Sequence, residues 1–171
     1  MRILRLTPVH AADYRAILLR AYADAPDAFT ATVAERAPLP LDWWAARVAD
    51  HPDPTELAYG AFVGGRLAGV AGLRFEQRER NRHKATLFGM YVAPACRGRG
   101  IGRALVEAVL THAQAAPRTR VVQLRVTASN APALRLYASC GFRPFGTEPY
   151  ALQAGERFLS VVHMWRAVDG P

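Results

Sequence analysis

Cysteine, lysine and long hydrophobic runs are all scarce in this sequence. Two cysteines, Cys96 and Cys140, among 171 residues cannot build a disulfide scaffold, and they favour a reducing, cytosolic setting. The apolar stretches are far shorter than the roughly 20 residues that cross a bilayer. Met1 is followed directly by Arg2, without the apolar core of a signal peptide. We therefore expect a cytoplasmic protein with no membrane anchor.

Although lysine is almost absent, the chain is basic. Lysine and arginine number 22 against 14 aspartates and glutamates, a formal net charge of +8. Such a charge keeps open a non-catalytic basic module that binds a nucleotide or a nucleic acid. The arginines are scattered through alanine-rich sequence, however, and the one dense cluster, residues 74–84, also fits a solvated hairpin end. A nucleic-acid partner is therefore the less favoured hypothesis.

The length and the hydrophobic pattern predict one α/β domain over residues 1–171. Hydrophobic residues make up 51% of the chain, and no repeat or long linker divides it. We predict a mixed, mostly antiparallel sheet with helices on both faces, in which residues 84–127 form a right-handed parallel β-α-β crossover. The predicted strands are 2–7, 56–63, 66–75, 84–93, 120–127, 142–145 and 156–165. The predicted helices are 13–23, 41–48, 101–113 and 130–140, with a proline-containing loop over 25–40.

A glycine-rich turn between the strand at 84–93 and the helix at 101–113 is the segment suited to chemistry. Gly98, Gly100 and Gly102 stand at alternate positions. The first turn of a helix has free backbone N–H groups at the positive end of the helix dipole, which suits a phosphate or pyrophosphate. A Walker A loop is excluded because its lysine is missing. A Rossmann fingerprint is disfavoured because Arg103 stands where its last glycine would be.

Two motifs then point to a family. Residues 97–102 read R-G-R-G-I-G, a match to R-x-x-G-x-G, and residues 130–142 match N-x-x-A-x-x-x-Y-x-x-x-G-F. In this order the two motifs resemble the acetyl-CoA loop and the second signature of the GCN5-related N-acetyltransferase (GNAT) family. The resemblance covers Arg2 to Trp165. It implies a GNAT-like fold and transfer of an acetyl group from acetyl-CoA directly to a primary amine of a small molecule, a peptide N-terminus or a lysine. At the level of the family, it also suggests a homodimer.

The resemblance assigns a role to each matched residue. The backbone of Met90 and Val92 would pair with the amides of the pantetheine arm, and Asn130 would hydrogen-bond that arm. Tyr137 would face the sulfur of acetyl-CoA and protonate the leaving thiolate. The pyrophosphate would be held by the backbone amides of the turn, which are those of Arg97, Gly98, Arg99, Gly100, Ile101, Gly102 and Arg103.

Physical arguments support part of this assignment. Gly89 inside a strand indicates a bulge, and a bulge there would splay the strand from its parallel neighbour and open a slot for a flat ligand. The arginines of the turn would steer the negatively charged coenzyme. Tyr137 has an ordinary pKa near 10, so it is protonated at pH 7 and can act as an acid. Two alternatives stay open: Tyr137 is only a core aromatic, and Asn130 is only a helix cap.

The general base is not assigned by the motifs. An alkylamine with a pKa near 10.4 is neutral in about 1 part in 2,500 at pH 7, a cost of roughly 4.6 kcal/mol that a base or a desolvating pocket must offset. The family often places a glutamate near the fourth strand, but residues 86–90 contain no carboxylate. Glu35 is the first candidate base, followed by His83 and Glu76. An equally open alternative is that Glu35 is a solvated loop acid.

The acceptor itself is not readable from the sequence. We expect the segments Ala25–Trp44 and Tyr150–Glu156 to choose it. Trp43 and Trp44 are adjacent, so one is expected in the core and the other near the acceptor. The five histidines lack the spacing of metal ligands, so we expect no metal.

Overall fold

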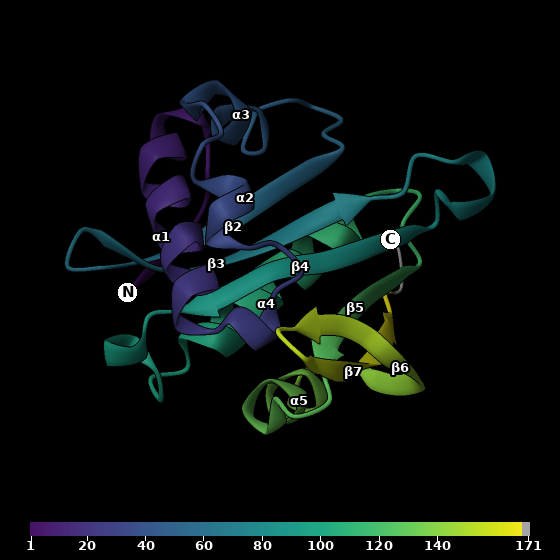
Figure 1. The fold of residues 1–171 in the computed structure, drawn as a ribbon. Helices are drawn as coiled ribbons and strands as arrows, with labels where there is room; N and C mark the ends of the chain where they lie inside the picture. The colour runs from purple at the N-terminus through teal and green to yellow at the C-terminus, as the bar shows by residue number, and fades with distance from the viewer. Residues whose placement is uncertain (169–171) are drawn as a thin grey trace.

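One seven-stranded sheet organises residues 1–168, the part of the chain that the computed structural model describes (Figure 1). The strand order is β1-β2-β3-β4-β5-β7-β6. Every neighbouring pair is antiparallel except β4 and β5, which are parallel. This confirms the mixed, mostly antiparallel sheet and the parallel crossover. The strands are β1 (Arg2–Arg5), β2 (Glu56–Val63), β3 (Arg66–Phe75), β4 (Lys84–Val92), β5 (Val121–Thr127), β6 (Arg143–Ala154) and β7 (Arg157–Ala167).

Helices cover both faces of the sheet, as predicted. In Figure 1, α1 (Ala11–Asp24), α2 (Val33–Arg36) and α3 (Leu41–Ala46) lie on the near face, and α4 (Ile101–Ala115) lies behind the sheet. α5 (Ala131–Ser139) lies below α4 in this view, next to its first turns, where Leu136 lies close to Gly102. Two apolar clusters result: one packs α4 and α5 against the sheet, and the other packs α1 and α3 against the opposite face. No helix of residues 1–168 is long and apolar enough to cross a membrane.

The most regular helix, α4, follows from its apolar spacing. Its buried side chains recur at intervals of three and four residues, which places them on one face of a helix. That face packs on β2, β3 and β4 and fixes the start of the helix above the carboxyl end of β4. The buried positions are Ile101, Leu105, Val106, Val109, Leu110 and Ala113.

A bulge in β4 separates that strand from β5. Between the pairs Val70↔Tyr91 and Gly72↔Phe88, β3 advances two residues and β4 advances three. Gly89 supplies the bulge with φ +60°, a conformation that L-residues with a side chain rarely adopt. β4 and β5 pair only as far as Thr86↔Gln123, so the rest of β4 has an open edge on that side. The predicted bulge and the predicted slot are both confirmed.

Two predicted segments were wrong. The loop at 25–40 contains the short helix α2, because Thr32 and Glu35 form a capping box: the Glu35 N–H donates to Thr32 Oγ1 at 3.2 Å, and the Thr32 N–H donates to the Glu35 carboxylate at 2.9 Å. The strand predicted at 142–145 extends to Ala154, so most of the segment Tyr150–Glu156, which we expected to choose the acceptor, belongs to β6. Prolines and two register shifts interrupt β6, and an exposed edge strand lacks the apolar alternation that identifies a buried strand.

Candidate active site

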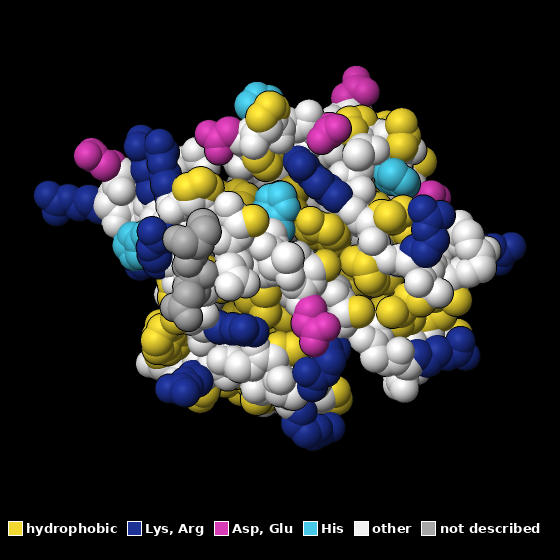
Figure 2. Space-filling model, turned by 180° about the vertical axis from the view of Figure 1, so that it is seen from behind, with side chains coloured by type: hydrophobic (Ala, Val, Ile, Leu, Met, Phe, Trp, Pro, Cys, Tyr) yellow, Lys and Arg dark blue, Asp and Glu magenta, His cyan; other side chains and the backbone are white. Residues whose placement is uncertain are grey.

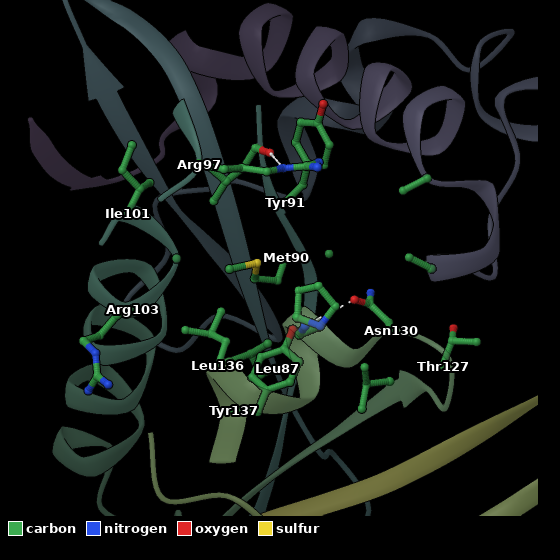
Figure 3. A pocket seen from close by; sticks show the side chains of 18 of the residues that line it. Leu87, Met90, Tyr91, Arg97, Ile101, Arg103, Thr127, Asn130, Leu136 and Tyr137 are labelled. Atoms are coloured by element: carbon green, nitrogen blue, oxygen red, sulfur yellow. Dashed lines mark hydrogen bonds between the residues drawn. The ribbon is translucent and has the colours of Figure 1, made fainter. Parts of the chain in front are cut away.

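A cavity of about 730 Å³ opens where β4 and β5 diverge. The start of α4 and the side of α5 form one part of its wall, and the end of α1 with the following turn forms the opposite part (Figure 3). The cavity brings together most residues that the resemblance assigns to the coenzyme. These are Met90, Val92, Arg97, Gly98, Gly100, Ile101, Gly102, Arg103, Asn130 and Tyr137. Arg99, in the same turn, does not line it.

Backbone N–H groups at the start of α4 are free to bind an anion. Gly98 and Gly100 have φ of +73° and +76°, and these angles aim successive N–H groups to one side of the turn, as in an anion-binding nest. Ala104 is the first residue of this stretch whose N–H has a backbone acceptor, Gly100 O at 3.0 Å. Within residues 1–168, the N–H groups from Gly98 to Arg103 donate to no protein atom. The turn therefore fits a diphosphate.

Gly102 has a different purpose from the other two glycines. A Cβ built on it would lie 2.9 Å from Met90 Cε and 3.1 Å from Leu136 Cδ2. The absence of a side chain lets α4 approach β4 and α5 closely. Met90 and Leu136, the two side chains that lie against Gly102, both line the cavity (Figure 3).

Two arginines of the turn are already engaged by protein groups. Arg97 Nε donates to Val92 O at 2.9 Å, and its guanidinium lies 5.8 Å from the centre of the Tyr91 ring. Arg103 projects from the side of α4 (Figure 3), with Nη1 3.4 Å from Ser139 O. The same nitrogen lies 3.7 Å from the Glu107 carboxylate. Both cations remain close enough to attract an anionic ligand.

The carbonyl of Val92 faces the open edge of β4. The next residue, Ala93, donates its N–H back to Ala68 O at 2.8 Å, toward β3. Val92 therefore points its own backbone groups away from β3, into the cavity, because successive residues of a strand alternate in direction. This is the orientation that the predicted pairing with an extended ligand requires. In this structure the Val92 carbonyl accepts a hydrogen bond from the Arg97 side chain.

Tyr137 forms part of the cavity floor. Its side chain is 6% exposed and its ring packs against Phe142 at a centroid distance of 5.9 Å. In Figure 3 its hydroxyl points toward Met90, and within the described residues that hydroxyl has no hydrogen-bond partner. Burial raises the pKa of Tyr137 well above its ordinary value. The group therefore keeps its proton at neutral pH and presents it to the cavity.

Asn130 is a helix cap and a cavity residue at once. Its Oδ1 accepts a hydrogen bond from the Ala133 N–H at 3.2 Å, which caps α5. The side-chain NH₂ group stays available to a ligand. Asn130 is thus a helix cap, as one alternative had it, but capping does not exclude the predicted contact with the pantetheine arm, which stays a prediction.

None of the predicted bases lines the cavity. The Glu35 carboxylate is exposed and caps α2. Glu76 lines a second cavity of about 660 Å³ beside His112, and His83 lies in the turn before β4. Among the described residues, the lining of the first cavity contains no carboxylate and no histidine. The structure does not bring the three candidates to the site, so their role as base stays a prediction.

Several residues of the cavity were missed from the sequence. Tyr91 lines it, and its hydroxyl donates to Asp24 Oδ2 at 2.5 Å. Burial, together with this hydrogen bond and the charge of Asp24, raises the Tyr91 pKa to about 12. Arg125 and Thr127 also line the cavity. The one available signal for them was their place at the carboxyl end of a strand that follows a parallel crossover.

Of the two adjacent tryptophans, only the one in the core lies where it was expected. Trp44 is fully buried in the core beside Tyr14. Trp43 does not line the cavity. Its ring lies against the guanidinium groups of Arg36 and Arg47, at 4.8 and 4.6 Å from the ring centre. The expectation that the second tryptophan faces the acceptor site is therefore not met.

Comparisons with known proteins agree with this geometry. The acetyltransferase (GNAT) family matches residues 18–142. Over 156 residues the chain is 33% identical to the L-amino acid N-acetyltransferase AaaT of Escherichia coli (strain K12), which covers 90% of this chain and 91% of that protein. Over 88 residues it is 41% identical to the N-alpha-acetyltransferase RimI of Mycobacterium tuberculosis, or 51% of this chain and 52% of that protein.

A solved structure gives the same answer for the fold. The GNAT-family acetyltransferase from Streptococcus pneumoniae superposes with a TM-score of 0.88 at 26% identity, over 98% of both chains. The alternative of a basic binding module finds no support, and on the face shown in Figure 2 the Lys and Arg side chains are scattered between hydrophobic and uncharged surface. The chain belongs to the GNAT family of acetyltransferases, and it is an N-acetyltransferase that acts on an amine.

Proposed function

We propose that the chain transfers an acetyl group from acetyl-CoA to the α-amine of a free amino acid. The observation that supports this acceptor most is the likeness to the Escherichia coli L-amino acid N-acetyltransferase, which extends over 91% of that protein. The likeness to the Mycobacterium tuberculosis RimI is higher in identity but covers about half of each chain. A peptide N-terminus is accordingly the second candidate acceptor.

The residues of the cavity fit acetyl-CoA. The free N–H groups from Gly98 to Arg103 suit its diphosphate, and the open edge of β4 suits an extended arm with amide groups. Acetyl-CoA supplies the acyl group as a thioester. Asn130 would donate its NH₂ to the arm, and the backbone of Met90 and Val92 would pair with it.

Tyr137 is the proposed acid. It holds a proton on its phenolic oxygen at neutral pH because burial raises its pKa. The amine nitrogen first bonds to the thioester carbon, and as the carbon–sulfur bond then breaks, this proton passes to the leaving sulfur. A backbone N–H, for which Met90 is our candidate, would stabilise the oxyanion that precedes the break.

The amine of the acceptor must lose a proton before it attacks. Ala25, Ala28 and Phe29 line the acceptor end of the cavity with apolar groups, and desolvation lowers the pKa of an amine. Glu35 remains our proposed base on the ground that it belongs to the neighbouring loop, and it would have to leave its capping position to act.

Thermal unfolding with coenzyme A tests the cosubstrate, and thiol release tests the acceptor. At a coenzyme concentration one hundred times Kd we expect about 2.7 kcal/mol of stabilisation. Thiol release should be faster with free amino acids than with peptides that present the same residue at the N-terminus. Faster release with peptides would replace the proposed acceptor, and no thermal shift would remove the coenzyme site.

We also propose a cytoplasmic location, and a homodimer that sedimentation would test.

A further inference from the structure

Arg125 is the one arginine from β5 among the described residues that line the cavity. Three arginines line the cavity, and two of them, Arg97 and Arg103, belong to the glycine turn and α4. Arg125 stands on β5, two residues beyond Gln123, the last residue that pairs with β4. It therefore lies where the two strands have already separated.

The register of β5 shows which way Arg125 points. Thr127 Oγ1 donates to Asp27 O at 2.6 Å, so Thr127 faces the turn that follows α1. Side chains two residues apart share a face of a strand, which puts Arg125 on the same face. Val126, between them, packs instead in the cluster of α4 and α5. Arg125 thus faces the side from which the acceptor segments cover the sheet.

Two neighbouring strands hold Arg125 in place. Its Nη2 donates to Glu148 Oε2 at 3.0 Å, and the same oxygen accepts a hydrogen bond from His163 Nε2 at 2.8 Å. His163 is also the direct register partner of Arg125. The hydrogen bond from His163, followed by the charge of Arg125, lowers the pKa of Glu148. One edge of the guanidinium is fixed in this way, while its other N–H groups have no hydrogen-bond partner within residues 1–168 and are available to a ligand.

The α-carboxylate of the proposed acceptor favours a cation in the wall of the cavity. In an α-amino acid the carboxylate is two bonds from the attacking amine, so its binding group must line the reaction cavity itself. A second arginine cluster, around Phe88, does not satisfy this condition. There Arg47 and Arg74 lie 3.0 and 3.1 Å from the Glu56 carboxylate, and neither lines the cavity.

We propose that Arg125 binds the α-carboxylate of the acceptor and that Glu148, anchored by His163, positions it. This inference rests on the proposed amino acid acceptor. It makes Arg125 a specificity residue that separates free amino acids from amines without a carboxylate. Glu148 acts through Arg125 and is a positioning residue.

The test compares three acceptors that share one side chain: the preferred free L-amino acid, its carboxamide, and the corresponding amine without the carboxyl group. For Arg125→Ala we expect KM for the free acid to rise at least tenfold, because a hydrogen bond to a charged group is lost. KM for the carboxamide and the amine should change less than threefold. The control is Arg143→Ala, an exposed β6 arginine outside the cavity, and it should leave all three values unchanged.

Glu148 is tested by rescue. Glu148→Ala should raise KM for the free acid about threefold with little change in kcat, and Glu148→Gln, which keeps an oxygen that accepts from Arg125, should restore most of the loss. Equal KM increases for acid and carboxamide in Arg125→Ala, or no increase, would overturn the role of Arg125 alone. A wild-type preference for the carboxamide or for peptides over the free acid would overturn the proposed acceptor as well. The thermal shift with coenzyme A should persist in every variant.

Discussion

The two ends of the cavity are built in different ways. At the α4 end the binding groups are backbone N–H groups of consecutive residues, and glycines at 98 and 100 give them their direction. At the acceptor end the lining consists of side chains from the turn after α1 and from β5, and Glu148 of β6 holds one of them, Arg125. The first end is a local motif, while the second exists only after distant segments meet. Ligand binding at the α4 end should therefore be sensitive to changes in backbone conformation, and ligand binding at the acceptor end to single side-chain substitutions.

The largest effect is expected where the two ends meet, at Tyr137. Tyr137→Phe removes the proton that we assign to the leaving sulfur, and general acid catalysis contributes about 10²–10⁴-fold. We expect kcat to fall by at least about 10²-fold, while the thermal shift with coenzyme A stays within error of the wild type. An unchanged kcat would leave Tyr137 a core aromatic only.

Substitutions at Gly100 and Gly102 should distinguish the effect of backbone direction on coenzyme binding from the effect of side-chain packing. Gly100→Ala places a side chain at φ +76°, which costs about 1–2 kcal/mol and moves the N–H groups. We expect affinity for coenzyme A to fall about tenfold, read from the same thermal titration, with little change in acceptor KM. Gly102→Ala is the matched control, because its Cβ meets the mobile ends of Met90 and Leu136. If Gly102→Ala lowers the affinity for coenzyme A more than Gly100→Ala does, the geometry of the turn is not what binds the coenzyme.

Tyr91, at the acceptor end, should make the free energy of unfolding depend on pH above pH 10. Its pKa is raised to about 12, first by burial and then by Asp24. A raised folded-state pKa favours the protonated form, so its contribution is complete below pH 10 and is lost as the pH rises from 10 toward 12. Tyr91→Phe also removes a hydrogen bond to a charged group, and we expect a loss of about 1.5 kcal/mol at pH 7 in urea unfolding. The variant should then lose less stability than the wild type between pH 10 and 12. An equal alkaline loss in both would assign that loss to other tyrosines.

The smallest effect is expected at Glu35. Glu35→Gln keeps the capping box, since glutamine can serve at this position, but removes the carboxylate. We expect kcat/KM to fall by about fivefold at pH 7, and by more at lower pH where fewer amines are neutral, because the proposed base is lost. A change of less than about twofold across the pH range would leave Glu35 only the cap of α2, outside the cavity.

The sequence was sufficient for the turn because each of its signals is local. Positive φ at Gly98 and Gly100, the amphipathic α4 and the bulge at Gly89 depend on residues close together in the chain. The acceptor end was not predictable in this way, since Arg125 and Glu148 are adjacent only after β5, β7 and β6 pair. The length of β6 was missed for a related reason: an exposed edge strand with Pro144 and Pro149 has no apolar alternation to reveal it. The short helix α2 could have been predicted, because Thr32 and Glu35 have the spacing of a capping box.

The separation of β4 from β5 also bears on how the chain avoids self-association. A strand edge with unpaired backbone groups is a template on which another chain can add a strand and begin to aggregate. Here that edge lies at the bottom of a narrow cleft, with Phe29 on one side and Leu136 on the other. One of its carbonyls, that of Val92, is covered by Arg97. These side chains stand between the open edge and any β-strand of another chain that would pair with it.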